Sequence, residues 1–257
     1  MSDFRGKFVW YELMTNDMKA AQDFYTAVVG WSAKDAGMPG MAYTLLSAGG
    51  TQVAGVMGMP GANGSAQMPP SWSGYVAVDD VDASTAEAKR AGATVLREPT
   101  DIPNVGRFSF IADPQGAMIA LFRGTSAAPP PQPAPSTPGL IGWRELHAAD
   151  WEAAWDFYAK LFGWQKDQAM DMGPMGTYQI FKNGSEMLGG MMTKAAVEPH
   201  PHWLYYMNVD AIDAAGVRVT KGGGQVLFGP SEVPGGSWIL QCRDPQGGVF
   251  ALVGPRK

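Results

Sequence analysis

Hydrophobic and polar residues follow a pattern that starts with a strand and a helix. Residues 7–14, KFVWYELM, alternate as a β-strand does, and the Asn16-Asp17 pair that follows provides good helix N-caps. One apolar stripe at helical spacing comes next, formed by Ala20, Ala21, Phe24, Tyr25 and Val28. Gly30 stands where a helix stop is expected. The opening therefore predicts a strand followed by an amphipathic helix.

The next 90 or so residues predict a hairpin and then a second unit that begins with a strand and a helix. The hairpin strands are residues 41–47 and 51–57, around Gly49-Gly50. The elements expected in the second unit are a strand at 73–80, a helix at 81–91, and strands at 93–98, 107–113 and 117–122. The last two strands meet at the turn Asp113-Pro114-Gln115-Gly116, which we interpret as structural. The glycine groups at 49–55 and 222–225 do not follow a strand-to-helix turn, so they are not phosphate-binding loops.

This order of elements occurs twice along the chain. Residues 10–31 and 143–164 are identical at 11 of 22 positions. Residues 72–122 and 203–253 align without a gap and share 17 of 51 residues, including the whole DPQG turn. Each half therefore reads as βαβββ followed by βαβββ, which predicts an α+β protein of four such modules.

A proline-rich segment separates the two halves. Residues 126–139, SAAPPPQPAPSTPG, contain six prolines and no large apolar residue, so they favour an extended conformation and form no core. We place the domain boundary there. The expected domains are residues 1–125 and 140–257, with 126–139 as a linker.

Composition narrows the class of protein. The chain has 257 residues, 46% of them hydrophobic and 17% charged, and a net charge of −5, which gives no reason to expect nucleic acid or an anionic membrane as a partner. The start, MSDFRGKF, has no apolar signal core, and no apolar run is long enough to span a bilayer, so we expect a cytoplasmic protein. The single cysteine, Cys242, excludes an internal disulfide and a cysteine-based zinc site. Sixteen methionines and nine tryptophans are suited to an adaptable apolar pocket, or simply to the core.

These motifs resemble the vicinal oxygen chelate superfamily, which includes glyoxalase I, bleomycin-resistance proteins and extradiol dioxygenases. The features that match are D-x-x-x-A-x-x-FY-x-x-x-x-G-W after the first strand, a VDDVD-like helix start, and DP-x-G before a closing strand. Both halves contain all of them. The resemblance implies two glyoxalase-like domains with cupped mixed sheets. It does not imply one activity, because the superfamily includes isomerases, dioxygenases, thiol transferases and drug-binding proteins.

In catalytic members of this superfamily His, Gln or Glu bind a divalent ion at three recurring strand positions. The resemblance assigns six residues here to these chelating positions, namely Trp10 and Trp143, Ser73 and Leu204, and Ala120 and Ala251. None of these side chains is a useful ligand for zinc, iron or nickel. We therefore predict a protein with no metal and no cofactor. An indole at the first position is suited to stacking on a flat ligand, and core packing is the alternative.

Two carboxylates are the candidate general acid–base residues. Glu12 and Glu145 each lie two residues after the tryptophan of their repeat, so each faces the same side of its strand as that indole. A carboxylate in an apolar cup suits proton transfer or binding of a cation. The alternative is a fixed structural contact, for example to Arg107, to Arg144, to an indole N–H or to backbone amides. Arg144 itself would then point to the helix side of its strand, where a charge is unfavourable unless that strand end is open.

Aromatic residues and one histidine complete the predicted site. The candidate ligand-binding residues are Trp10, Trp143, Tyr75, Tyr206, Tyr43, Tyr178 and His147. His147 shares a face with Glu145, and His200 and His202 lie in EPHPHW, residues 198–203. A weaker hypothesis is a displaced metal site in the second half only, formed by Glu145, His147 and His202.

The leading functional hypothesis is a metal-free protein that binds a hydrophobic or aromatic small molecule, for sequestration or resistance, as bleomycin-resistance relatives do. The competing hypothesis is an enzyme: a lyase or isomerase of the glyoxalase kind, or a metal-independent tailoring enzyme that uses Glu12 or Glu145 as general base. A structural role is a third option if side chains fill both cups. The sequence leaves open whether the protein is a monomer or a homodimer, and whether the first module pairs with the second or with the fourth.

Overall fold

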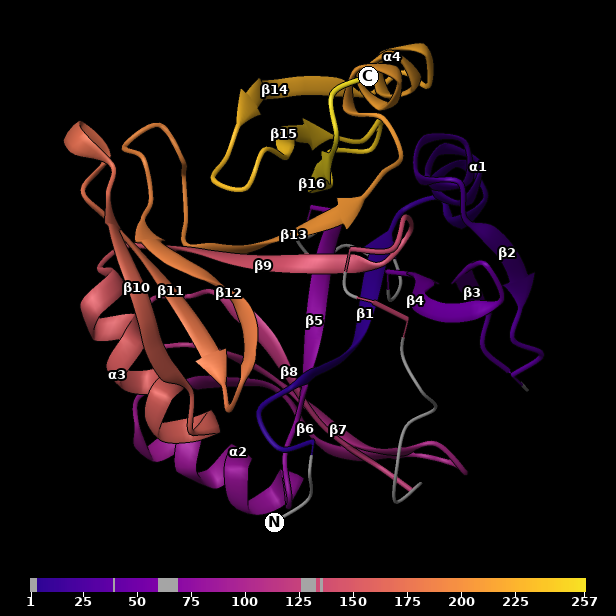
Figure 1. Ribbon diagram of the computed structural model, residues 1–257. Helices are drawn as coiled ribbons and strands as arrows, with labels where there is room; N and C mark the ends of the chain where they lie inside the picture. Colours follow the sequence, from indigo (N-terminus) through magenta and orange to yellow (C-terminus); the bar gives the residue numbers. More distant parts are fainter. Residues whose placement is uncertain (1–3, 39, 60–68, 126–132, 135) are drawn as a thin grey trace. The chain divides into compact units, whose positions relative to one another are not determined.

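The computed structural model describes residues 4–38, 40–59, 69–125, 133–134 and 136–257 (Figure 1). The first half contains β1 (Phe8–Thr15), α1 (Met18–Val29), β2 (Ser32–Asp35), β3 (Tyr43–Ala48), β4 (Thr51–Gly58), β5 (Ser71–Ala77), α2 (Val81–Arg90), β6 (Thr94–Ile102), β7 (Gly106–Ala112) and β8 (Met118–Gly124). The second half contains β9 (Ile141–Ala148), α3 (Trp151–Phe162), β10 (Gln165–Asp171), the short 3-10 helix η1 (Gly173–Met175), β11 (Thr177–Asn183), β12 (Glu186–Thr193), β13 (His202–Asn208), α4 (Ile212–Lys221), β14 (Gln225–Glu232), β15 (Trp238–Arg243) and β16 (Val249–Gly254).

Each half supplies one mixed eight-stranded sheet. The strand order is β2-β3-β4-β1-β5-β8-β7-β6 in the first sheet and β10-β11-β12-β9-β13-β16-β15-β14 in the second. In every module the first strand pairs in parallel with the last, as β1 does with β4 and β9 with β12, and the intervening strands pair antiparallel. The predicted α+β architecture of two glyoxalase-like domains, with βαβββ modules 1 to 4 in chain order, is confirmed.

The helix signals in the sequence cap the helices of modules 1 and 3. The Asp17 carboxylate accepts a hydrogen bond from the backbone N–H of Ala20, and Gly30 ends α1 with a φ of 86°, a left-handed conformation that glycine adopts without strain. Asp150 and Gly163 cap α3 in the same way. None of the described helices is both long and apolar enough to cross a membrane.

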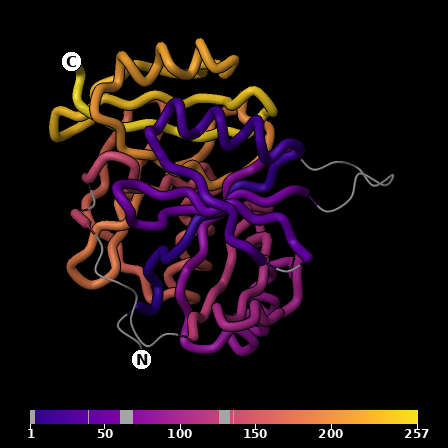
Figure 2. The backbone as a smooth tube through the Cα atoms, turned by 90° about the vertical axis from the view of Figure 1, so that its right-hand side faces the viewer, coloured from indigo at the N-terminus to yellow at the C-terminus, as the bar shows by residue number. Residues whose placement is uncertain are grey.

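The described chain packs as two compact units, and each unit takes modules from both halves. Unit 1 lies within Met1–Trp10, Ser73–Pro131 and Trp143–Trp203, and unit 2 lies within Tyr11–Trp72, Gln132–Gly142 and Leu204–Lys257. In unit 1 helix α2 packs beside α3, and in unit 2 helix α1 packs beside α4 (Figures 1 and 2). Within the units, module 1 therefore packs with module 4 and module 2 with module 3 through their helices. The pairing of the first module with the fourth is one of the two that the sequence left open.

Repeated motifs contact each other in unit 2. The Tyr25 hydroxyl donates to Asp244 Oδ2 at 3.0 Å and accepts from the Trp72 indole N–H at 2.9 Å. Burial, and then the Asp244 charge, raise the pKa of Tyr25 well above its usual value, so the phenol stays protonated and can donate. The Gln246 side chain accepts from the Asp17 backbone N–H at 2.7 Å and donates to the Asp17 carbonyl at 2.9 Å.

The equivalent residues make the same contacts in unit 1. The Tyr158 hydroxyl donates to Asp113 Oδ2 at 2.9 Å and accepts from the Trp203 indole at 3.1 Å. Gln115 forms two hydrogen bonds with the backbone of Asp150, at 2.7 and 2.9 Å. The FY and DP-x-G motifs recur together because the tyrosine of one half binds the aspartate of the other. The structural interpretation of both DPQG turns is therefore correct.

Two strands were not located by the sequence pattern. Strands β2 and β10 lie at sheet edges, and most of their residues are exposed and polar. Such edge strands do not alternate between core and solvent, so they carry no period-2 signal. Residues 126–132 and 135 of the proline-rich segment lie outside the described residues, and the expected linker boundaries stay a prediction. At the end of that segment the carbonyl of Thr137 accepts from the Asn208 side chain at 3.1 Å.

Candidate functional site

A continuous hydrogen-bonded network extends from the face of β9, and all its members belong to unit 1. The Tyr178 hydroxyl accepts from the Trp143 indole N–H at 2.8 Å and donates to Glu145 Oε2 at 2.7 Å. The other oxygen of Glu145 lies 2.7 Å from His147 Nε2, and His147 Nδ1 lies 2.8 Å from Glu198 Oε2. We call these five residues the β9 network. The predicted shared face of Glu145 and His147 is confirmed.

Burial and charge set the protonation of this network. Burial by itself lowers the pKa of His147, but its hydrogen bonds to Glu145 and Glu198 and their negative charges raise that pKa to about 9. Burial raises the pKa of Glu198, yet the bond to His147 and its charge bring the net value below the usual one. The neighbouring His202 has a lowered pKa because of burial and then the positive charge of His147. At neutral pH an imidazolium therefore lies between two carboxylates, beside a neutral imidazole.

The first half repeats only part of this arrangement, in unit 2. The Tyr43 hydroxyl donates to Glu12 Oε2 at 2.9 Å, as Tyr178 does to Glu145. Both carboxylates are buried, with exposed fractions of 6% for Glu12 and 7% for Glu145. Met14 occupies the place of the imidazole. A carboxylate–phenol pair is thus common to both halves, and an extended polar network is found in the described residues of the second half.

Two glycines make room for these phenols. Gly55 on β4 lies opposite Glu12, and Gly190 on β12 lies opposite Glu145. A Cβ added to Gly55 would overlap the ring and hydroxyl of Tyr43, and one added to Gly190 would overlap Tyr178. The glycine-rich stretch that ends at Gly55 therefore serves close approach of an aromatic ring. The sequence offered no direct signal for this role.

Trp10 is part of an apolar cluster in unit 1. It packs against buried Tyr75, Phe108 and Ala120. Other partly buried members of this cluster are Val9, Ile102, Phe110 and Phe122. Tyr75 meets the Phe110 ring edge-to-face, with centroids 5.4 Å apart. The predicted ligand contacts Trp10 and Tyr75 therefore lie together in one apolar cluster, whereas Trp143 belongs to the β9 network.

The structure does not favour a metal at the chelating positions. In unit 1, Trp10 and Ala120 belong to the apolar cluster, and the buried Ser73 hydroxyl has no hydrogen-bond partner among the described residues. A serine hydroxyl, an indole and a methyl group do not make up a donor set for a divalent transition metal. The Trp143 indole nitrogen carries a proton, which it donates to Tyr178, so it offers no lone pair. The residues at these positions therefore do not fit the metal that the superfamily implies.

The arginines named as alternative carboxylate partners have other contacts. The Arg144 guanidinium lies over the Phe8 ring, 5.3 Å from its centroid, which accounts for a charged side chain on this side of β9. Arg107 is bound to Asp82 at 2.7 Å and to Asp101 at 2.8 Å. The difficulty that the sequence raised about Arg144 is thus resolved by a cation–π contact.

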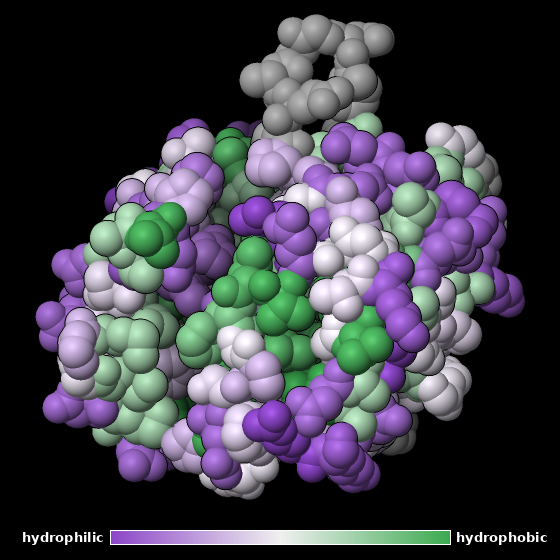
Figure 3. Space-filling view, turned by 90° about the horizontal axis from the view of Figure 1, so that it is seen from above, coloured by the Kyte–Doolittle hydropathy of each residue, from purple (hydrophilic) through white to green (hydrophobic). Residues whose placement is uncertain are grey.

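Tyr206, the last of the predicted ligand-binding residues, lies in unit 2, and so do the surface depressions. Tyr206 accepts a hydrogen bond from the Gln241 side chain at 3.3 Å. Figure 3 shows apolar residues gathered on the side where α4 and β14 lie in Figure 1. One shallow apolar depression of about 280 Å³ lies there, lined in part by Ile212, Val217, Val226, Pro230 and Leu240. It contains none of the predicted site residues.

Glu198 is the residue that the sequence-based prediction missed. The segment EPHPHW contains it, but the hypothesis of a displaced metal site named Glu145, His147 and His202 as donors. In the structure Glu198 takes the third place, because His147, Glu198 and His202 offer donor atoms that all lie within 4.8 Å of one another. Glu145 instead lies on the Nε2 side of the His147 ring. The signals that the sequence offered for Glu198 were its negative charge and its short spacing to His200 and His202.

Comparison with known proteins identifies the family. The family model of the Glyoxalase/Bleomycin resistance protein/Dioxygenase superfamily matches residues 7–121 and again residues 140–252. This chain therefore belongs to that superfamily, with two copies of its domain. The protein "Putative glyoxylase CFP32" of Mycobacterium tuberculosis is 32% identical over 96% of this chain and 94% of its own length. "Anthracycline biosynthesis protein DnrV" of Streptomyces peucetius is also 32% identical, over 96% of this chain and 93% of its own.

Solved structures share the fold at low sequence identity. The Mn(II)-bound glyoxalase from Novosphingobium aromaticivorans superposes with a TM-score of 0.66 and 16% identity, covering 98% of this chain and 83% of that protein. The 2,3-dioxygenase LapB from Pseudomonas sp. KL28 has a TM-score of 0.64 and 13% identity, covering 99% of this chain and 94% of its own. At these identities the likeness establishes the fold and not the activity.

Proposed function

We propose that this protein binds a planar hydrophobic or aromatic small molecule beside the β9 network, without a metal at the chelating positions, and so sequesters the molecule or confers resistance to it. The observation that carries this proposal is the network itself. It places a half-buried indole, Trp143, next to a phenol and a buried carboxylate. An aromatic ring can stack on the indole while its polar groups bind to the charged end of the network.

The relatives support this choice of ligand class. DnrV, which matches nearly the whole chain, is named for anthracycline biosynthesis. Anthracyclines are planar polycyclic aromatic compounds that carry hydroxyl and carbonyl groups. Such a compound has both the flat apolar face and the hydrogen-bonding groups that the β9 network can recognise.

Quenching of tryptophan fluorescence tests the proposal. Protein treated with a chelator should show saturable quenching when an anthracycline aglycone is added. Trp143→Ala should weaken binding by about 5- to 30-fold, because truncating an aromatic anchor costs on the order of 1–2 kcal/mol. Trp10→Ala is the matched control from the other half and should change the affinity less. Unchanged affinity in Trp143→Ala would contradict the site, and absence of quenching by any planar aromatic compound would contradict the function.

A second candidate is an enzyme that uses Glu145 as general base. The observation that favours it is the 2.7 Å contact between Glu145 and His147, because a carboxylate next to an imidazole can exchange a proton within the site. The first-half counterpart, Glu12, is bound to a phenol in the same way. The expected chemistry is proton transfer next to a carbonyl group, as in a lyase or isomerase, or a tailoring step on an aromatic substrate.

Turnover of methylglyoxal–thiol adducts, with and without added zinc or nickel, separates the two candidates. An enzyme should convert the adduct and lose most of its turnover in Glu145→Gln or Glu12→Gln. A binding protein should show no turnover under either condition while still quenching with an aromatic ligand. Turnover that survives both substitutions would exclude these carboxylates as the base.

A further inference from the structure

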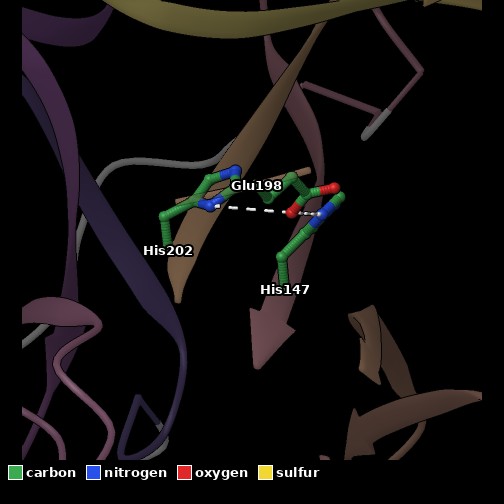
Figure 4. A group of neighbouring side chains, drawn as sticks. All are labelled: His147, Glu198 and His202. Carbon is green, nitrogen blue, oxygen red and sulfur yellow. Dashed lines mark hydrogen bonds and ion pairs between the residues drawn. The ribbon is translucent and has the colours of Figure 1, made fainter. Parts of the chain in front are cut away.

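The end of the β9 network is a cluster of three side chains that come from separate elements (Figure 4). His147 projects from β9, His202 opens β13, and Glu198 belongs to the loop before β13. Glu198 Oε2 lies 2.8 Å from His147 Nδ1 and 4.0 Å from His202 Nδ1, and the two imidazole rings are 4.8 Å apart with a tilt of 31°. All three residues belong to unit 1.

We propose that His147, Glu198 and His202 form a binding site for one divalent transition-metal ion, of which Zn²⁺ is the best match. Two imidazoles and one carboxylate are a donor set that zinc accepts with one position left open. This site is distinct from the chelating positions, because His147 lies four residues beyond Trp143 along β9. It also differs from the sequence-based prediction of a metal-free protein, which considered the chelating positions first.

The spacing of the donors suits closure around an ion. Zinc–nitrogen and zinc–oxygen bonds of about 2.0–2.2 Å separate neighbouring ligand atoms by roughly 3.3–3.5 Å. The three donors here lie within 4.8 Å of one another, so the widest pair must approach by about 1.4 Å. Glu198 and His202 have side-chain exposures of 24% and 33%, so rotation of these two side chains can provide the movement. His147 is buried and serves as the fixed ligand, and zinc displaces the proton from its Nδ1 atom on binding.

The surroundings of His147 are those of a metal-bound histidine. A ligating imidazole commonly donates its other ring N–H to a carboxylate, which fixes the tautomer and strengthens the ligand. Glu145 provides this contact at 2.7 Å from Nε2, and the Tyr178 hydroxyl holds the second oxygen of Glu145 at 2.7 Å. The Trp143 indole in turn holds Tyr178. Glu145, Tyr178 and Trp143 thus form an ordered outer shell behind the proposed ligand His147.

The loop that carries Glu198 is also held in place. The Lys194 ammonium donates to the Glu198 carbonyl at 2.6 Å, and the Glu198 backbone N–H donates to the carbonyl of Ala195 at 3.0 Å. His202 Nδ1 lies 3.1 Å from the carbonyl oxygen of His200, which orients its ring. In the first half, Met14 replaces His147 and Ser71 precedes the strand tryptophan as His202 does. We therefore expect one metal site per chain.

Zinc titration of the full chain tests the site independently of the proposed aromatic ligand. After removal of bound metal with EDTA and dialysis, isothermal titration with Zn²⁺ alone should show one equivalent bound per chain. His202→Ala and Glu198→Gln should abolish this binding. Glu145→Gln, which removes only the outer-shell contact, should weaken it by about 10–100-fold. Co²⁺ in place of Zn²⁺ should give visible absorption bands that the ligand variants lose.

Two matched controls make the result specific. His200→Ala removes an exposed histidine of the same loop, and Glu12→Gln removes the first-half counterpart of Glu145. Both should bind zinc as the unaltered protein does. His202 and Glu198 are partly exposed, so their variants test the site even if His147→Ala fails to fold, and circular dichroism checks each variant. Absence of zinc binding, its persistence in both His202→Ala and Glu198→Gln, or its loss in His200→Ala would overturn the proposal. Quenching by an aromatic ligand is measured on the unaltered, chelator-treated protein, so failure of zinc binding leaves the proposed function to be judged by that separate assay.

Discussion

The contact between Tyr158 and Asp113 allows a direct test of how modules 2 and 3 pack in unit 1. We consider the substitution Tyr158→Phe, which removes one oxygen atom and keeps the ring. The hydroxyl is fully buried, donates to Asp113 Oδ2 at 2.9 Å and accepts from the Trp203 indole at 3.1 Å. The substitution therefore removes a hydrogen bond to a buried carboxylate and leaves an indole N–H without this acceptor.

The expected cost follows from these two losses. A hydrogen bond to a charged group contributes about 1.5–3 kcal/mol, and a buried donor left without a partner costs about 1–3 kcal/mol. We expect Tyr158→Phe to lower the free energy of unfolding by roughly 3–5 kcal/mol, since neither group can reach water without rearrangement. Burial already raises the pKa of Asp113, and the hydrogen bond from Tyr158 opposes that effect. Its loss should raise the pKa of Asp113 further.

Urea unfolding followed by tryptophan fluorescence gives the measurement. Tyr25→Phe is the internal comparison, because Tyr25 makes the same two contacts with Asp244 and Trp72 in unit 2. A double-mutant cycle of Tyr158→Phe with Asp113→Asn should give a coupling energy of at least about 1 kcal/mol. A loss below about 1 kcal/mol for both tyrosines, or additive effects within about 0.3 kcal/mol, would refute the reasoning.

Three further predictions follow from other contacts. Gly190→Ala should lower the free energy of unfolding by about 1–3 kcal/mol in urea, because a Cβ there overlaps Tyr178. In a Tyr178→Ala background, where the overlap is absent, adding Gly190→Ala should cost much less. Fragments 1–125 and 140–257, expressed together, should purify as one complex, because each compact unit takes modules from both halves; independent elution would contradict this. Burial raises the pKa of Cys242 to about 12, so its thiol should react with iodoacetamide at pH 8 only after urea unfolds the protein. Rapid labelling of the native protein would show that the thiol is accessible and contradict this prediction.

Sequence patterns predicted those parts of the fold where burial imposes a period. The helix that begins after Asp17 was predicted because it buries one face and its cap residues have defined conformations. The strand at 7–14 was predicted from its alternation, although Tyr11, Glu12 and Leu13 are all buried in the structure. The edge strands β2 and β10 were not located, because their exposed polar residues satisfy no period. The contact of Tyr25 with Asp244 also escaped prediction, since two residues more than 200 positions apart leave no local signal.

The candidate site was predicted in part for the same reason. Residues on one strand, such as Glu145 and His147, were placed on a common face by their spacing alone. Tyr178 was named as a candidate, but its role between Trp143 and Glu145 depends on the pairing of β9, β12 and β11, which spacing does not give. Glu198 lies in a loop, where no period exists, and only its proximity to His202 marked it.

The repeat itself explains why the second half is the place to look for function. The tyrosine of each FY motif binds the aspartate of the DP-x-G turn in the other half, so these motifs contribute to the packing of both halves. Positions outside these contacts, such as Met14 and His147, are under no such shared requirement and differ between the halves. The carboxylate–phenol pair occurs in both halves, whereas the described imidazole–carboxylate cluster is built around His147. Chemistry that depends on charge is therefore expected where the copies differ, and Glu145→Gln should affect ligand or metal binding more than Glu12→Gln.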